Sequence, residues 1–257
     1  MPDSLPDASH RPWPLPARPW VMRQTWHDLL FAHWPVAVEY LRPFVPGELA
    51  LDSCDGQAWL AVAPFWMSGI RMRGLPPLPG LSSFPELNVR TYVKGPAGSS
   101  ASRPASESKP GVYFFSLDAG NALAVAAARA WYRLPYQNAM MKVEITGDEV
   151  HYTSRRTSHP LPAELVCHYK PIGPVSPSKS PLETFLTERY CLYAVSGPGR
   201  LLRAEIHHAP WSLQPAEARW QVNTVTESHG MILPPVQPLL HFSKRLDVFV
   251  WAPQQVR

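Results

Sequence analysis

Prolines recur along the whole chain and limit the length of any helix that it can form. The 257 residues include 31 prolines, and a proline inside a helix removes a backbone hydrogen bond and clashes with the preceding turn. The segments between prolines are short, and many of them alternate between apolar and polar residues, as half-buried strands do. We therefore expect a β-rich α+β fold with few helices.

The composition permits a sizeable buried core in one domain. Apolar residues make up 45% of the chain and charged residues 17%, and all-β chains of this length often form a single unit. No shift in composition suggests a domain boundary within residues 20–252. Residues 1–19 are rich in proline and lack periodicity, so we expect a flexible leader followed by a single domain.

Several segments carry patterns of particular elements. Strands are predicted at residues 21–34, near 49–52, and at 58–67, 85–95, 111–120, 219–226 and 239–251; those near 49–52 and at 58–67 form a hairpin, and a second hairpin turns at residues 146–148. Helices are predicted at residues 35–42, in NALAVAAARAWY with Asn121 as N-cap, after Pro181, and after LLRAEIHH within APWSLQPAEARW.

Charge and motifs argue against several classes of protein. The net charge of +4 is mild and the longest basic run is Arg155-Arg156, whereas a nucleic-acid-binding protein needs a dense basic face. The N-terminus lacks the features of a signal peptide, and no apolar stretch approaches the roughly 18 residues of a membrane span. No GxGxxG or P-loop motif is present, so neither a nucleic acid, a membrane nor a cofactor is expected.

Cysteines and histidines do not predict a metal site. Cys54, Cys167 and Cys191 are far apart in the chain, without metal-ligand spacing or a disulfide framework, which favours a reduced, cytoplasmic setting. His207 and His208 are adjacent, so on a strand they point to opposite faces and at most one joins a given site. We predict no metal.

The clearest candidate site is one face of the strand PELNVRTYVKG. Glu86, Asn88 and Arg90 alternate with apolar residues, so they share a face. If the apolar face packs against helices outside a barrel, a carboxylate and a guanidinium point into its lumen and can bind and polarise a small polar substrate. The alternative, which periodicity alone favours, is a solvent-facing polar side of an antiparallel strand. Arg189 in TERYCLY can reach an anion or form a structural salt bridge.

Several blocks of sequence resemble the YqjF-like family of uncharacterised bacterial proteins. The blocks are WPVAVEYLRPFVPGELALD, FPELNVRTYV, GVYFFSLDA, LETFLTERYCLY, IHHAPWSLQPAEA and HFSKRLDVFVW, and the resemblance spans residues 20–251. That family is similar in fold to acetoacetate decarboxylase. The resemblance therefore implies a closed, mainly antiparallel β-barrel core with a few flanking helices and an internal pocket, and by analogy a homo-oligomer.

The resemblance also implies a change in chemistry. Acetoacetate decarboxylases carry a Pro-Lys-Lys segment that falls here on Pro135-Tyr136-Gln137, and their strand-borne acid maps to Glu86. Both lysines are missing, and Lys142 belongs to the next strand. Tyr136 and Gln137 cannot form the imine that a Schiff-base decarboxylase requires, so the resemblance implies a pocket in which they donate and accept hydrogen bonds.

Our leading hypothesis is a protein that binds a small carbonyl or carboxylate compound without a Schiff-base lysine. Glu86 is the candidate acid or base and Arg90 the contact to an anion or carbonyl, with Asn88, Tyr136, Gln137 and Arg189 as ligand-binding residues. Two alternatives stay open. One is a lysine-independent lyase or dehydratase acting on keto acids, and the other is a structural or interaction module without a ligand, so the sequence leaves enzymatic activity undecided.

Overall fold

The computed structural model describes residues 5–96, 108–157, 162–197 and 199–256. It is strand-rich, with 51% strand and 12% helix. The strands are β1 (Met22–Val36), β2 (Ala50–Leu51), β3 (Ala58–Met72), β4 (Phe84–Lys94), β5 (Pro110–Ala119), β6 (Tyr136–Thr146), β7 (Glu149–Arg156), β8 (Glu164–Pro171), β9 (Cys191–Val195), β10 (Leu201–His208), β11 (Gln214–Asn223), β12 (Leu239–Val250) and β13 (Gln254–Val256). The α-helices are α1 (Val38–Leu41), α2 (Ala122–Tyr132) and α3 (Pro181–Thr187). The predicted β-rich α+β class is confirmed.

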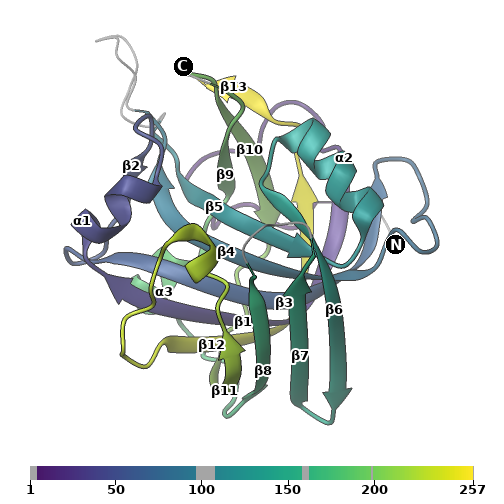
Figure 1. The fold of residues 1–257 in the computed structure, drawn as a ribbon. Coiled ribbons are helices and arrows are strands. Elements are labelled where there is room, and N and C mark those ends of the chain that lie inside the picture. The colour runs from purple at the N-terminus through teal and green to yellow at the C-terminus, as the bar shows by residue number, and fades with distance from the viewer. Residues whose placement is uncertain (1–4, 97–107, 158–161, 198, 257) are drawn as a thin grey trace.

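The strands pair into two closed rings that share five strands. The first ring is a nine-stranded barrel that runs β1-β3-β4-β5-β6-β7-β8-β11-β12 and returns to β1. The second runs β1-β3-β4-β5-β9-β10-β12 and also returns to β1. Figure 1 shows β9 and β10 on one side of the shared strands and β6, β7, β8 and β11 on the other. The predicted closed, mainly antiparallel barrel is therefore present, with a second ring beside it.

The two rings separate where β5 and β12 change partners along their length. The first half of β5 pairs with β9, through Val112 and Tyr113, whereas its end at Leu117–Ala119 pairs with β6. Likewise, β12 pairs with β11 through His241 and Phe242 and with β10 through Val248–Val250. Each of these two strands thus belongs to both rings.

Both faces of the shared sheet are buried, because a ring closes over each of them. On β4, Leu87, Val89 and Val93 belong to a core cluster that includes barrel residues from β7 and β8. The opposite face of β4 carries Tyr92, which packs in a second cluster with residues of α2, α3, β9 and β10. The polar residues Glu86, Asn88 and Arg90 alternate with the first set and so lie on the side of the second ring.

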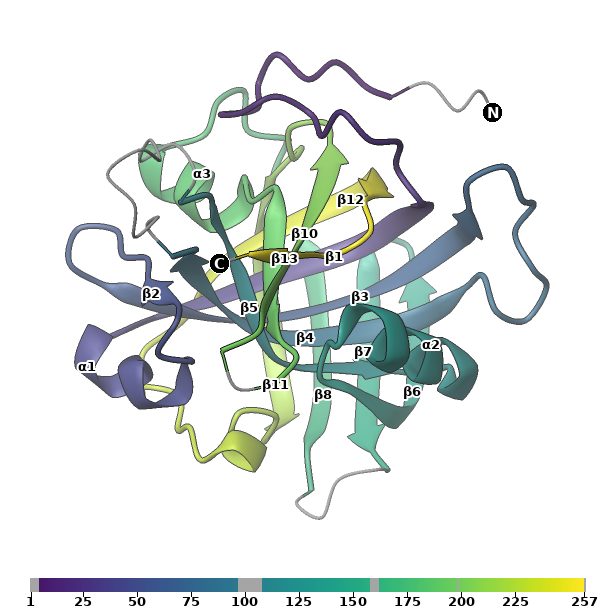
Figure 2. The same ribbon diagram turned by 90° about the horizontal axis from the view of Figure 1, so that it is seen from above.

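Helix α2 has its position because β5 and β6 run parallel, and parallel neighbours need a crossover connection. Asn121 begins the helix as predicted, since its side-chain oxygen accepts a hydrogen bond from the backbone N–H of Ala124 at 3.1 Å. The helix ends at Arg133, which has a left-handed conformation with φ of 55°. The crossover places α2 beside the open end of the second ring (Figure 2).

One predicted element and one predicted strand pairing are wrong. The short helix expected after β10 is instead part of β11, which pairs with β8 and alternates in burial from residue to residue. The strand near 49–52 does form, as β2, but it pairs with β4 rather than with β3. Because β3 is already flanked by β1 and β4, it has no free edge for a hairpin partner.

Residues 5–19, for which the sequence predicts a flexible leader, lie against β10 and β12 in this structure. Arg11 donates a hydrogen bond to the carbonyl oxygen of Ile206 and forms an ion pair with Glu205. Trp20, directly after the leader, packs edge-on against Phe249 at 5.3 Å between ring centroids. In the described ranges, no helix has the length and apolar character that crossing a bilayer requires.

Candidate functional site

A chamber of about 110 Å³ lies inside the second ring. Five of the six predicted site residues line it, namely Glu86, Asn88, Arg90, Tyr136 and Arg189. The polar face of β4 therefore lines a cavity, and its side chains are buried from bulk water. The roles of these residues toward a ligand stay predictions.

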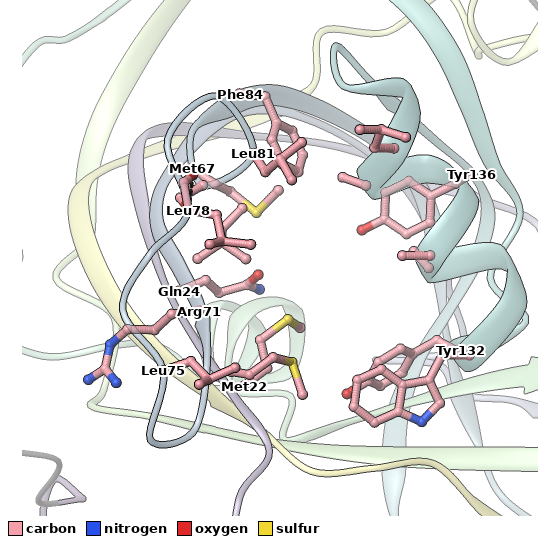
Figure 3. Close-up of a pocket in the computed structure, with 18 of the residues that line it drawn as sticks. Met22, Gln24, Met67, Arg71, Leu75, Leu78, Leu81, Phe84, Tyr132 and Tyr136 are labelled. Carbon is pink, nitrogen blue, oxygen red and sulfur yellow. Dashed lines mark hydrogen bonds between the residues drawn. The ribbon is translucent and has the colours of Figure 1, made fainter.

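An apolar opening, which we call the vestibule, adjoins the chamber between α2 and the loop that joins β3 to β4 (Figure 3). Its volume is about 350 Å³. The chamber and the vestibule have five lining residues in common, which are Met22, Gln24, Ala128, Tyr132 and Tyr136. The two spaces therefore adjoin at these residues.

Glu86 is a buried carboxyl group held by two side chains. The hydroxyl of Tyr136 donates a hydrogen bond to its Oε2 atom at 2.7 Å, and the side chain of Asn88 forms a second hydrogen bond to it. Burial raises the pKa of Glu86 to about 7, although both hydrogen bonds act in the opposite direction. Near neutral pH both protonation states are populated, as a group that exchanges protons with a ligand requires.

Arg90 differs from the other buried arginines of the described residues. Arg11, Arg156 and Arg189 each form an ion pair with a carboxylate, whereas Arg90 has no carboxylate within 4.0 Å in the described part of the chain. Its guanidinium lies 5.3 Å from the ring centroid of Phe31 and forms a hydrogen bond with Tyr92. A buried cation without a counter-ion is costly, so the predicted role of Arg90 as an anion contact is compatible with its surroundings.

Other unpartnered polar atoms belong to side chains of the same chamber. The Nε atom of Arg90 and the indole Nε1 atoms of Trp26 and Trp211 are buried donors without a hydrogen-bond partner in the described residues. The Oδ1 atom of Asn88 is a buried acceptor in the same condition. Since buried polar groups are nearly always hydrogen-bonded, the chamber has the donors and acceptor of a site for a polar ligand. The two indole donors escaped the sequence analysis, because tryptophans spread along a chain carry no signal of shared location.

Arg189 and His208 also line the chamber, but Arg189 is paired with a carboxylate and His208 is uncharged. The guanidinium of Arg189 pairs with Asp52 at 2.7 Å and donates to the carbonyl oxygen of Phe185 at 2.6 Å, so the predicted structural salt bridge is present. Burial lowers the pKa of His208 to about 4, so this imidazole is neutral at physiological pH. Arg90 is therefore the unpaired cation of the chamber's described lining.

Gln137 is the predicted site residue that the structure does not bring to the chamber. It follows Tyr136 on β6, and successive residues of a strand point to opposite faces. Its side-chain oxygen accepts a hydrogen bond from the Nη2 atom of Arg129 on the exposed side of α2 at 3.1 Å. Tyr136 alone of this pair lines the chamber.

None of the chain's six lysines lines the chamber or the vestibule. Each lies within 4.0 Å of a carboxylate, in the pairs Lys94–Asp52, Lys109–Glu205, Lys142–Glu144, Lys170–Glu217, Lys179–Glu188 and Lys244–Asp28. Lys142 is 67% exposed at its side chain, on the outside of the barrel. In the described ranges, no group of three or more histidine, cysteine or acidic side chains is arranged to hold a metal ion.

Comparisons with known proteins place the chain in a family. Residues 23–247 match the DUF2071 family, described as an uncharacterized conserved protein. The chain is also 48% identical over 233 residues to the uncharacterized protein YqjF of Bacillus subtilis (strain 168), a match that covers 90% of this chain and 91% of that protein. The chain belongs to the YqjF-like family. The resemblance seen in the sequence blocks is thereby confirmed.

Solved structures similar to this YqjF-like chain share the acetoacetate decarboxylase-like fold. Acetoacetate decarboxylase from Legionella pneumophila has a TM-score of 0.60 at 10% identity, with 97% of this chain and 93% of that chain covered. The enduracididine biosynthesis enzyme MppR, in a complex with pyruvate, has a TM-score of 0.60 at 12% identity, with 93% and 91% covered. At such low identity the likeness shows the fold alone, and it confirms the predicted fold class.

The raised pKa of Glu86 predicts how its replacement affects stability. A carboxyl group whose folded pKa of about 7 exceeds its ordinary 4.5 stabilises the fold below pH 4.5, and this contribution is lost as pH rises through 7. We expect the Glu86→Gln variant to gain stability relative to the wild type between pH 5 and pH 8, by up to about 3 kcal/mol. Urea unfolding across this range measures the difference. Glu144→Gln is the control, since the pKa of that exposed carboxylate is lowered by Lys142; an equal gain there, or none for Glu86→Gln, contradicts the assignment.

The contrast between Arg90 and Arg156 predicts two different mutational costs. Arg156 donates to Asp118, Ser116 and Ser228, so Arg156→Met breaks a buried ion pair and should cost about 3–5 kcal/mol. Arg90→Met breaks no ion pair of the described residues and should change the free energy of unfolding by about 1 kcal/mol or less. Both values come from urea unfolding at pH 7. A cost for Arg90→Met equal to that for Arg156→Met would show that the Arg90 guanidinium is a structural group.

Proposed function

We propose that this protein binds a small carboxylate that also carries a carbonyl group. The observation that carries the proposal is Arg90, a buried guanidinium without a carboxylate partner among the described residues, on the chamber wall that also holds Glu86. A guanidinium matches a carboxylate in charge and geometry. The carboxylate of the ligand supplies the missing counter-ion of Arg90.

The arrangement along β4 supports a ligand with two polar ends. Glu86 and Arg90 are four residues apart on one face, which separates their Cα atoms by about 13 Å, and Asn88 lies between them. Both side chains line the same chamber of about 110 Å³, roughly the space of four water molecules. A carboxylate at Arg90 then places an adjacent carbonyl group near Asn88 and Glu86, as in a 2-oxo acid. Pyruvate, a compound of this class, is bound in the structurally similar MppR complex.

We further propose that the ligand is bound without a covalent imine. Imine formation needs a neutral amine within reach of the carbonyl carbon. Every lysine of the chain is next to a carboxylate, and none is among the chamber's lining residues. The three cysteines are free thiols, which supports the cytoplasmic setting that we propose for this protein.

A second candidate function is proton transfer at the carbon next to the carbonyl. The pKa of about 7 for Glu86 favours it, since a carboxylate of that basicity accepts a proton efficiently near neutral pH. Glu86 takes the proton from the carbon, the electrons of the C–H bond form a C=C double bond, and the second electron pair of the carbonyl bond moves onto its oxygen. The resulting enolate then takes the proton back or expels a leaving group. This would be lyase- or dehydratase-type chemistry without a lysine.

Binding is expected to depend on Arg90. Isothermal titration with pyruvate or 2-oxobutanoate at pH 7 should give a measurable Kd for the wild type. The Arg90→Met variant should bind at least tenfold more weakly, because it lacks the cation that balances the carboxylate. The Lys142→Met variant, which removes an exposed cation, serves as the control. Equal affinity of the wild type and Arg90→Met, or no binding by either, overturns the proposal.

Proton transfer is expected to depend on Glu86 and to need no imine. In D₂O, the wild type should speed deuterium incorporation at the methyl group of pyruvate, measured by proton NMR, and Glu86→Gln should abolish this gain. Borohydride added with pyruvate should leave the protein's mass unchanged. Exchange that persists in Glu86→Gln removes the assigned base, and a mass adduct on any lysine disproves the imine-free proposal.

A further inference from the structure

The vestibule is built from two apolar rims that face each other. One rim is the loop after β3, with Leu75, Leu78 and Leu81, and the other is the face of α2 that carries Leu123 and Trp131. Figure 3 shows the loop side chains on one side of the space and Tyr132 and Tyr136 on the other. Three methionines and Phe84 add to the apolar lining.

These rims leave large apolar side chains exposed to solvent. Leu75 and Leu78 are each 58% exposed, Leu123 is 67% exposed and Trp131 is 42% exposed. Such residues scattered singly are ordinary, but residues gathered around one opening mark a binding site for an apolar group. The vestibule therefore has the surface of a site for an apolar group, with Gln24, Arg71 and Ser82 as polar members of a mostly apolar lining.

The vestibule adjoins the charged chamber, and the two differ in size. The chamber, at about 110 Å³, accommodates only a small polar head, whereas the vestibule holds about 350 Å³. A cavity of about 150 Å³ accommodates a six-carbon ring, so the vestibule has room for an apolar group of about ten carbons. Met22 and Tyr136 line both spaces, so a ligand whose head lies at Arg90 has its tail directed between the rims.

From the adjacency of these two spaces we infer that the physiological ligand is amphiphilic: a 2-oxo acid or related oxo carboxylate with a medium-length alkyl or aryl tail that fills the vestibule. The inference rests on the proposed function for the head group and adds the class of the tail. A three- or four-carbon acid occupies the chamber alone and leaves the apolar rims exposed. The tail is what distinguishes one carboxylate from another at this site.

A series of 2-oxo acids with unbranched tails tests the inference. The acids are pyruvate, 2-oxobutanoate, 2-oxohexanoate, 2-oxooctanoate and 2-oxodecanoate, titrated calorimetrically at one pH and salt concentration. A fully buried methylene tightens binding about fourfold, and a partly open vestibule reduces this to about twofold. We expect Kd to fall by two- to fourfold per methylene over this series.

Two tryptophan substitutions on α2 form a matched pair of variants. Ala127 lines the vestibule, so Ala127→Trp fills it and should return the affinity for 2-oxooctanoate to that for 2-oxobutanoate, which itself stays unchanged. Ala126 is exposed, is not among the vestibule's lining residues, and lies on another face of the same helix. Ala126→Trp should leave the whole series unaltered. Leu78→Asp tests the opposite rim and should weaken only the long-tailed acids.

The outcomes separate the inference from the proposed function. If pyruvate binds through Arg90 and longer tails bring no gain, the proposed function stands and the inference is overturned. If no acid of any length binds, the proposed function itself fails. If 1-octanol binds as well as 2-oxooctanoate and Arg90→Met changes neither affinity, the vestibule binds apolar groups without a carboxylate head at Arg90, and the inference is overturned. If sedimentation shows a dimer that Leu78→Asp dissociates, the rims cover a second copy of the chain, and the inference is wrong.

Discussion

Burial of both faces of one five-stranded sheet is the constraint on which the rest of this structure depends. In an ordinary antiparallel sheet, a strand such as β4 packs one face on the core and leaves the other in water. Here the nine-stranded barrel encloses Leu87 and Val89, and the second ring encloses Glu86 and Arg90. Closure of that ring through β9 and β10 removes these polar side chains from bulk water, so their chemistry follows from desolvation.

Desolvation acts differently on the two ends of the β4 polar face. Glu86 responds by a raised pKa, because the neutral acid is better tolerated in a buried site. Arg90 has no such response, since a guanidinium stays protonated in proteins. Elsewhere in the described residues, buried guanidinium groups have carboxylate partners, as Arg156 has Asp118. This contrast between paired structural cations and one unpaired cation in a chamber is what supports our proposal that Arg90 serves binding rather than stability.

Features that depend on the pattern within one strand were predicted from the sequence, whereas features that depend on pairing between distant strands were missed. Alternation on β4 correctly grouped Glu86 with Arg90, but the same alternation is compatible with solvent or with a chamber, and the choice depends on pairings such as Val112 with Leu192. The helix-favouring residues of QPAEAR were overruled by pairing of β11 with β8. The placement of Gln137 was accessible to sequence reasoning: beside an inward Tyr136, a neighbour on the same strand must point outward.

The position of Tyr136 links the fold to the chemistry that we propose. It begins β6 at the crossover from α2, where the sequence resemblance places the amine segment of decarboxylases, and its hydroxyl donates to Glu86. An amine there attacks a carbonyl carbon, whereas a phenol can only donate a hydrogen bond or hold a proton. With the lysines paired to carboxylates elsewhere, our proposal assigns polarisation of a bound carbonyl group to Arg90, Asn88 and the Tyr136–Glu86 pair. In that proposal binding is reversible and guided by charge, and turnover proceeds through proton transfer at Glu86.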